Sequence, residues 1–234
     1  MKHLILDIGG VLVYPRLGDW HIPYRAAEIL GPARAASLQT EAFRAAQAAG
    51  MAWLDEGRRV SGVETERMLR WGFVLELDRR MGWHMTDSEI IAMRDDFTDD
   101  IDRYGFFDDV KEYLARWRGN YSLALLSDAM PSILDFLERY GILALFDAAV
   151  ISTHVGATKP DARMYAAVLE QLNANPDDCL FVDDRMDNLL GARAAGMNAA
   201  QMSRPEFPAA KLWDGPVVRG FSGLDALLRE GGFA

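Results

Sequence analysis

Five short apolar runs divide the chain, and none of them alternates between apolar and polar positions. This continuous pattern is typical of strands in parallel sheets, which helices cover on both faces. Such runs are too short to be helices of ordinary length. We therefore expect buried strands at residues 3–7, 122–127, 147–152, 179–183 and 197–202.

Segments with helical spacing of apolar residues separate these strands. Pro131 opens one such segment and Gly141 follows it, and Gly196 follows another, as is typical of helix starts and ends. Because strands and helices alternate, the sequence predicts an α/β fold: a Rossmann-like three-layer sandwich with a parallel sheet. The expected helices span residues 110–117, 131–140, 165–172, 187–195 and 224–228.

The spacing of polar strand ends predicts an insertion. Ser127 to Lys159 is 32 residues and Lys159 to Asp183 is 24, each close to one βα unit of about 30 residues. Asp7 to Ser127 is 120 residues, so about 85 to 90 residues are expected in excess of regular units. This segment contains no plausible strand pair.

Two motifs predict that the insertion is helical. Ser61-x-x-Glu64 and Thr86-x-x-Glu89 each precede a stretch with helical apolar spacing, as capping boxes do. The sequence thus predicts a helical cap at residues 16–101 and a discontinuous core at residues 1–15 and 102–234.

Polar residues gather where the expected strands end. Asp7, Ser127 and the pair Asp183–Asp184 follow three strands, and Lys159 lies in a loop that opens a helix. Ligands of open α/β sheets bind beyond this carboxyl edge. Three carboxylates and one ammonium leave a net charge of −2, which one Mg²⁺ would neutralise, and carboxylate oxygens suit Mg²⁺.

Composition narrows the class of protein. Lys and Arg number 25 against 35 Asp and Glu, and the net charge of −10 disfavours nucleic acid or anionic lipid as a partner. Asp7 interrupts the first apolar run before it reaches the length of a signal peptide's apolar region. Cys179 is the one cysteine in the sequence, so the chain cannot form an internal disulfide. No apolar run approaches the roughly 18 residues of a membrane span. We expect a cytoplasmic protein without a membrane partner.

Four segments in order, LILDIGGV, LALLSDA, VGATKPDARMY and CLFVDDRMDNLLGARAAGM, resemble the four motifs of the haloacid dehalogenase superfamily. The resemblance covers almost the whole chain. It points to the group with a helical cap after the first motif, which includes sugar phosphatases and the phosphatase-like N-terminal domain of epoxide hydrolases. It implies a Mg²⁺-dependent phosphatase acting on a small phosphorylated metabolite, as a monomer or homodimer.

The resemblance also implies roles for single residues. Asp7 matches the nucleophile that becomes an aspartyl phosphate. Ser127 matches the phosphate-binding motif, with Asp128 beside it as a further substrate-binding candidate. Lys159 matches the lysine that holds the nucleophile and the phosphoryl oxygens together. Arg58 lies on a cap turn that faces the active site in this family, and it is a candidate substrate contact.

The same comparison implies the metal ligands. Asp7, the backbone carbonyl of Gly9 and Asp184 match the protein ligands of Mg²⁺. Asp183 and Asn188 match groups that support Asp184 or reach the metal through water.

One position departs from the family pattern, because Gly9 stands where a second aspartate usually acts as acid for the leaving group. Losing a general acid typically costs roughly 10²–10⁴-fold in rate. We therefore expect a preference for good leaving groups, such as those of sugar 1-phosphates or acyl phosphates. Candidate substitute acids in the expected cap are His21, Asp55 and Glu56.

Other functions remain open at this point. A metal-independent haloacid dehalogenase shares the aspartate nucleophile, but its fourth motif ordinarily lacks an acidic pair. A phosphonate-cleaving relative needs a cap lysine, and residues 16–101 contain none. A signalling receiver domain has its acidic pair first along the chain. A family member that binds a phosphorylated ligand or a protein without turnover is the alternative that Gly9 motivates.

Overall fold

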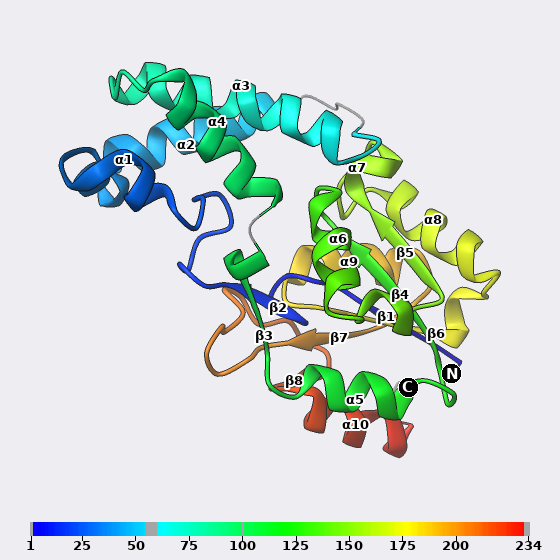
Figure 1. Ribbon diagram of the computed structural model, residues 1–234. Helices are drawn as coiled ribbons and strands as arrows, with labels where there is room; N and C mark the ends of the chain where they lie inside the picture. The colour runs from blue at the N-terminus through cyan, green and yellow to red at the C-terminus, as the bar shows by residue number, and fades with distance from the viewer. Residues whose placement is uncertain (1, 55–59, 100, 232–234) are drawn as a thin grey trace. The chain divides into compact units, whose positions relative to one another are not determined.

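The computed structural model describes residues 2–54, 60–99 and 101–231 (Figure 1). The chain forms two compact units, and each is described by itself. We call them the sheet unit, Met1–Tyr14, Phe106–Ala129 and Ile133–Ala234, and the helical unit, Pro15–Gly105 and Met130–Ser132.

A parallel six-stranded sheet is the framework of the sheet unit. Its strand order is β5-β4-β1-β6-β7-β8. The strands are β1 His3–Leu6, β4 Ser122–Ser127, β5 Ala148–Ile151, β6 Cys179–Asp183, β7 Asn198–Met202 and β8 Val217–Val218. The sequence therefore predicted this α/β fold correctly.

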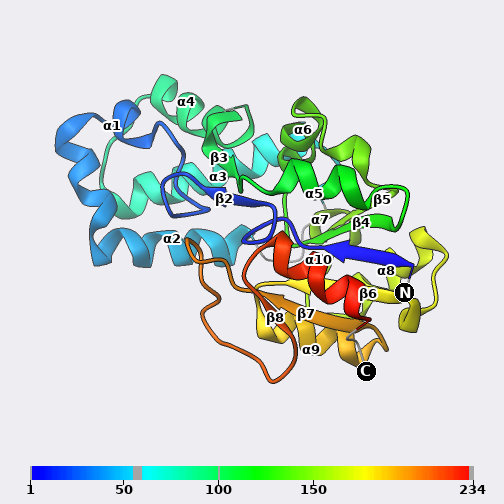
Figure 2. The same cartoon turned by 90° about the horizontal axis from the view of Figure 1, so that it is seen from below.

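The continuous apolar runs become strands because both faces of the sheet are covered. Ile5 and Phe181 belong to a buried cluster with α8 (Ala162–Leu172) and α9 (Met186–Ala194). The alternate residues point to the opposite face, where α5 (Val110–Trp117) packs on α10 (Phe221–Glu230). Figure 2 shows α10 running across this face.

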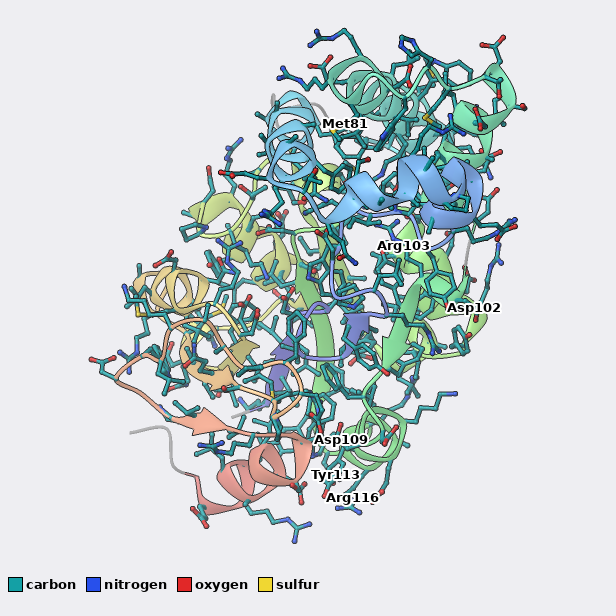
Figure 3. The ribbon with its side chains drawn as sticks, turned by 90° about the vertical axis from the view of Figure 1, so that its left-hand side faces the viewer. Met81, Asp102, Arg103, Asp109, Tyr113 and Arg116 are labelled. Carbon is teal, nitrogen blue, oxygen red and sulfur yellow. The ribbon has the colours of Figure 1, made fainter. Side chains whose placement is uncertain are left out.

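Asp109 and Arg204 join elements on the α5 side of the sheet unit. The Asp109 carboxylate accepts from the Phe221 amide at 2.8 Å and from the Arg204 Nη1 atom at 3.0 Å. Arg204 also donates from Nη2 to the Val11 carbonyl at 2.8 Å. Figure 3 labels Asp109 at the start of α5, with Tyr113 and Arg116 further along that helix. These contacts fix the loop that follows β1.

Two further helices belong to the loops beyond β4 and β5. They are α6 Ser132–Arg139, whose first residue belongs to the helical unit, and α7 Ser152–Val155. Throughout the described ranges, no helix is both long and apolar enough to cross a membrane.

The helical unit packs around its own apolar cluster. It contains α1 Ala26–Ala35, α2 Glu41–Leu54, α3 Val63–Met81 and α4 Asp87–Thr98. Phe43, Phe73 and Phe97 are among the wholly or almost wholly buried side chains of this cluster. The sequence did not predict the two-stranded sheet of β2 (Val13–Pro15) and β3 (Tyr104–Phe106), through which the chain passes from one unit to the other.

The two predicted capping boxes have different outcomes. The Thr86 side chain accepts from the Glu89 amide, and Glu89 accepts from the Thr86 amide, so this box is confirmed. The Ser61 box is wrong, because α3 begins with Gly62 as its N-cap and without a side-chain cap bond. This start places Glu64 in the second position of the helix, and a capping box needs the acid in the third.

Thr86→Ala is expected to lower the free energy of unfolding by about 1 kcal/mol, the usual value of an N-cap side chain. Ser61→Ala is the matched control and is expected to change it by less than about 0.5 kcal/mol, as for other exposed sites. Urea unfolding of both variants measures the difference. Equal losses would show that the Ser61 hydroxyl also caps a helix.

Candidate active site

The carboxyl ends of β1, β4 and β6 bring the candidate residues together. Leu6 pairs with Leu125 in β4 and with Val182 in β6. Asp7 directly follows β1, Asp183 is the last residue of the neighbouring strand β6, and Ser127 is the last residue of β4. The register therefore places three polar side chains at one edge of the sheet, as the sequence predicted.

The ammonium of Lys159 lies between two carboxylates. Its Nζ atom is 2.9 Å from Asp7 Oδ1 and 2.7 Å from Asp183 Oδ2. It also donates to the Leu126 carbonyl at 3.0 Å. The side chain is 1% exposed, so water screens these interactions little.

The Asp183 carboxylate accepts two further hydrogen bonds besides its contact with Lys159. Its Oδ1 atom accepts from the Arg185 amide at 2.8 Å, and its Oδ2 atom accepts from Asn188 Nδ2 at 2.9 Å. The Tyr165 hydroxyl in turn donates to the Asn188 carbonyl at 2.7 Å. With both oxygens occupied, Asp183 is suited to orient Lys159 rather than to react.

Asp7, Asp183 and Asp184 form a group that could hold a metal ion. Each offers one carboxylate oxygen, and the three oxygens lie within 4.8 Å of one another. Asp184 packs directly on the chain after the first strand, because a Cβ atom on Gly10 would lie 3.0 Å from its carboxylate. Gly10 also has a φ of +68°, so this close approach requires glycine.

The electrostatics of the group depend on burial and on neighbouring charges. Burial raises the pKa of Asp7 to about 6, with Lys159 opposing and Asp183 adding to the shift. Burial raises the pKa of Asp184 to about 7, and the charge of Asp7 adds to it. For Lys159, burial alone would lower the pKa, but Asp183 and Asp7 outweigh it, so its pKa lies above the ordinary value.

The residues present fit a magnesium ion. The donors are hard carboxylate oxygens, which Mg²⁺ prefers. Three carboxylates against one ammonium leave a buried excess of negative charge that a divalent cation would neutralise. In the turn after β1, the Ile8 carbonyl accepts backbone hydrogen bonds and the Gly10 amide donates one. Among the residues that the structure describes, no backbone amide donates to the Gly9 carbonyl, so this oxygen is free for a cation.

The structure places other candidate residues in different surroundings. The Ser127 hydroxyl hydrogen-bonds to Asp7 and lowers its pKa in part. Asp128 accepts from the Lys159 amide at 2.9 Å, so it holds the lysine loop in place. His21 belongs to the helical unit. Arg58, Asp55 and Glu56 lie outside the described residues.

Sequence reasoning missed two supporting residues. Gln201 is fully buried in β7, and its Nε2 atom donates to the Asp184 carbonyl at 2.9 Å. Tyr165 acts on Asn188, as described above. An amide side chain inside an apolar strand is a signal that could have indicated Gln201, since buried polar groups are nearly always hydrogen-bonded.

Comparison with known proteins identifies the family. Residues 1–196 match the sequence model of the haloacid dehalogenase-like hydrolases. The chain belongs to this family of hydrolytic enzymes.

Curated relatives include phosphatases. The chain is 42% identical to phosphatase MT3486 of Mycobacterium tuberculosis over 119 residues, which are 50% of this chain and 52% of that protein. It is 33% identical to phosphoserine phosphatase of Thermus thermophilus over 115 residues, 46% of each chain. The chain thus spans about half the length of these curated relatives.

Solved structures share the fold over nearly the full chain. The L-2-haloacid dehalogenase of Xanthobacter autotrophicus aligns with a TM-score of 0.70 at 22% identity, covering 98% of both chains. A HAD phosphatase of Thermococcus onnurineus aligns with a TM-score of 0.61 at 19% identity, covering 97% of this chain and 98% of that one. At these identities, the likeness establishes the Rossmann-like fold.

The stability of the protein is expected to depend on Mg²⁺ and pH together. The folded metal-free protein holds protons on Asp7 and Asp184 above their ordinary pKa of 3.8, so these groups make it less stable as pH rises from about 4 to about 7. Metal binding needs both carboxylates deprotonated. Mg²⁺ should therefore raise Tm more at pH 8 than at pH 5, measured by differential scanning calorimetry.

Asp184→Asn is the control for this experiment, and it should lose the Mg²⁺-dependent increase in Tm at pH 8. An equal increase at both pH values, or one that survives this substitution, would contradict a carboxylate metal site here.

Proposed function

We propose that this protein is a Mg²⁺-dependent phosphatase that hydrolyses a small phosphomonoester through an aspartyl phosphate on Asp7. The observation that carries the proposal is the grouping of Asp7 with a buried lysine and two further carboxylates at one sheet edge. The phosphatase relatives support the same reaction. A cytoplasmic location and a role of the helical unit as the cap that selects the substrate are parts of this proposal.

The reaction requires two transfers of the phosphoryl group. An Asp7 oxygen attacks phosphorus, the bond from phosphorus to the ester oxygen breaks, and the leaving alkoxide oxygen takes a proton from solvent. Water then attacks phosphorus and loses a proton to solvent, the bond to Asp7 breaks, and phosphate and the free carboxylate are released. A carboxylate is a weak nucleophile, so it depends on neighbouring groups for orientation and charge compensation.

Lys159 supplies one positive charge to this reaction. From its position at 2.9 Å it fixes the Asp7 carboxylate, and it remains protonated because its pKa is raised by Asp183 and Asp7. Charge that develops on the phosphoryl oxygens is stabilised by fixed donors in a site with little water. The Ser127 hydroxyl, which bonds to Asp7, is a second donor at this edge.

Asp7, Asp184 and the Gly9 carbonyl would hold Mg²⁺, with Asp183 and Asn188 in support. The bound ion supplies positive charge that neutralises the phosphate dianion and the carboxylates together. Without such a cation, the excess of negative charge at this edge would repel an anionic substrate.

A haloacid dehalogenase is the second candidate, because the sheet and helices align with that of Xanthobacter autotrophicus. The acidic group argues against it. A 2-haloacid is itself an anion, and Asp183 and Asp184 would oppose its approach without a metal. Release of chloride from chloroacetate in the presence of EDTA, with no phosphate release from any ester, would favour the dehalogenase.

Asp7→Asn is expected to lower kcat for phosphate release by at least about 10³-fold, because it removes the nucleophile. A panel of sugar phosphates, nucleotides, acyl phosphates and p-nitrophenyl phosphate measures this, with Mg²⁺ or with EDTA. Asp187→Asn is the matched control, since Asp187 is an exposed acid in the first turn of α9 that the proposed reaction does not use. Activity that survives Asp7→Asn would overturn the proposed nucleophile.

Gly9 leads to an expected dependence on the leaving group. With no carboxyl side chain at this position, acyl phosphates and sugar 1-phosphates should be hydrolysed roughly 10²-fold or more faster than simple alkyl phosphates, within the range of general acid catalysis. Gly9→Asp should raise the rate on alkyl phosphates more than the rate on acyl phosphates. Steady-state kcat/KM values on both classes measure the effect, and equal values in the native protein would contradict it.

A further inference from the structure

The helical unit contains a second group of buried polar side chains, apart from Asp7. Arg70 on α3 is 5% exposed, and Arg103 at the end of the short helix η2 (Ile101–Arg103) is 4% exposed. Figure 3 labels Arg103. Arginine is almost never buried without charge partners, because its desolvation is costly.

The buried carboxylate of Glu66 contacts Arg70, but its shorter hydrogen bonds are to another residue. Glu66 accepts from the Ser132 amide at 2.8 Å and from the Ser132 hydroxyl at 2.9 Å. Its contact with Arg70 Nε is longer, at 3.5 Å. The Nη1 atom of Arg70 is buried and has no hydrogen-bond partner within the described ranges. Arg70 therefore keeps donors that Glu66 does not satisfy.

Arg103 is held by neutral groups. Its Nη1 atom donates to the Phe97 carbonyl at 2.7 Å, and its Nη2 atom donates to the Trp20 carbonyl. Its Nε atom is buried without a hydrogen-bond partner among the residues that the structure describes. Backbone carbonyls orient the guanidinium but carry no negative charge to balance it.

The two arginines contact the same aromatic ring, and the charges of both act on one histidine. Both guanidinium groups lie over the Phe97 ring, at 4.4 Å for Arg70 and 4.7 Å for Arg103. Burial lowers the pKa of His21 to about 4, and the charges of Arg70 and Arg103 lower it further against the opposing charge of Asp19. His21 is thus neutral at pH 7, and its buried Nδ1 atom also lacks a partner in the described part of the chain.

We propose that Arg70 and Arg103, together with His21, form a binding site in the helical unit for the carboxylate or phosphate group of a small molecule. An oxyanion satisfies unpaired guanidinium donors, and it balances the positive charge that the two arginines carry in excess of the Glu66 carboxylate. The neutral imidazole adds a polar atom without a further charge. This inference does not rest on the proposed phosphatase activity.

Anion titration tests the site. The increase in Tm with malonate or with phosphate, relative to chloride at equal ionic strength and with EDTA present, gives an affinity for each anion. Saturable binding is expected. Arg70→Lys and Arg103→Lys keep the charge but lose the planar fork, so each should weaken binding by at least about tenfold. Tighter binding of malonate identifies a carboxylate ligand, and tighter binding of phosphate identifies a phosphate ligand.

Two controls separate this site from others. Arg80→Lys, on the exposed part of α3, should leave the affinity unchanged. Ser127→Ala, in the sheet unit, leaves the buried Lys159 contacts in place and should also retain the affinity. Loss of binding there alone would place the anion beside Asp7 and overturn the proposal. An equal increase in Tm with malonate, phosphate and chloride would also overturn the proposal. The unpaired arginine donors would then be satisfied by buried water molecules.

A measurement on the native protein needs no substitution in the site. Arginine Nε–H resonances in ¹⁵N-edited spectra should shift with malonate or phosphate along a saturable curve. If no such resonance moves, the proposal fails even where the arginine variants do not fold. Because these readouts are independent of turnover, failure of the phosphatase assay and failure of the anion site remain distinguishable.

Discussion

The contact of the Lys159 ammonium with Asp7 and Asp183 is the constraint on which the sheet edge depends. Two carboxylates and one lysine are almost wholly removed from water there, and burial of any one of them without the others is strongly unfavourable. The contact links the end of β1, the end of β6 and the loop before α8. It therefore ties the parallel sheet to a fixed position of the nucleophile, with the third carboxylate, Asp184, packed on Gly10.

Much of this edge of the sheet was predictable, because strands of a parallel sheet that is covered on both faces have continuous apolar sequences. Continuous apolar runs located the central strands, and polar residues at their ends had to meet once the strands were parallel. Asp7, Ser127 and Asp183 follow from that rule alone. Their roles needed the resemblance to a family, because geometry gathers the carboxylates but does not assign a nucleophile among them. The role of Gln201 was missed, because its strand was identified from its apolar residues and the one buried amide side chain was not considered.

The helical unit was less predictable, because its structure depends on tertiary contacts. Ser61 and Thr86 have the same local motif, yet only Thr86 caps a helix. Glu66 and Arg70 have the i,i+4 spacing of an exposed ion pair, but both are buried on α3. Nothing in their spacing indicates that Ser132, which is distant in sequence, would donate two hydrogen bonds to the Glu66 carboxylate. The charged residues of this unit thus became interpretable only in three dimensions.

The central claim is that Asp7 itself carries the phosphoryl group, and rapid acid quenching during turnover tests it most directly. Excess enzyme is mixed with an acyl phosphate and Mg²⁺, quenched, digested and analysed by mass spectrometry. The account predicts that the peptide containing Asp7 gains the mass of one phosphoryl group and loses it as phosphate is released. Steady phosphate release without that modified peptide, or with the phosphoryl group on another residue, would contradict it.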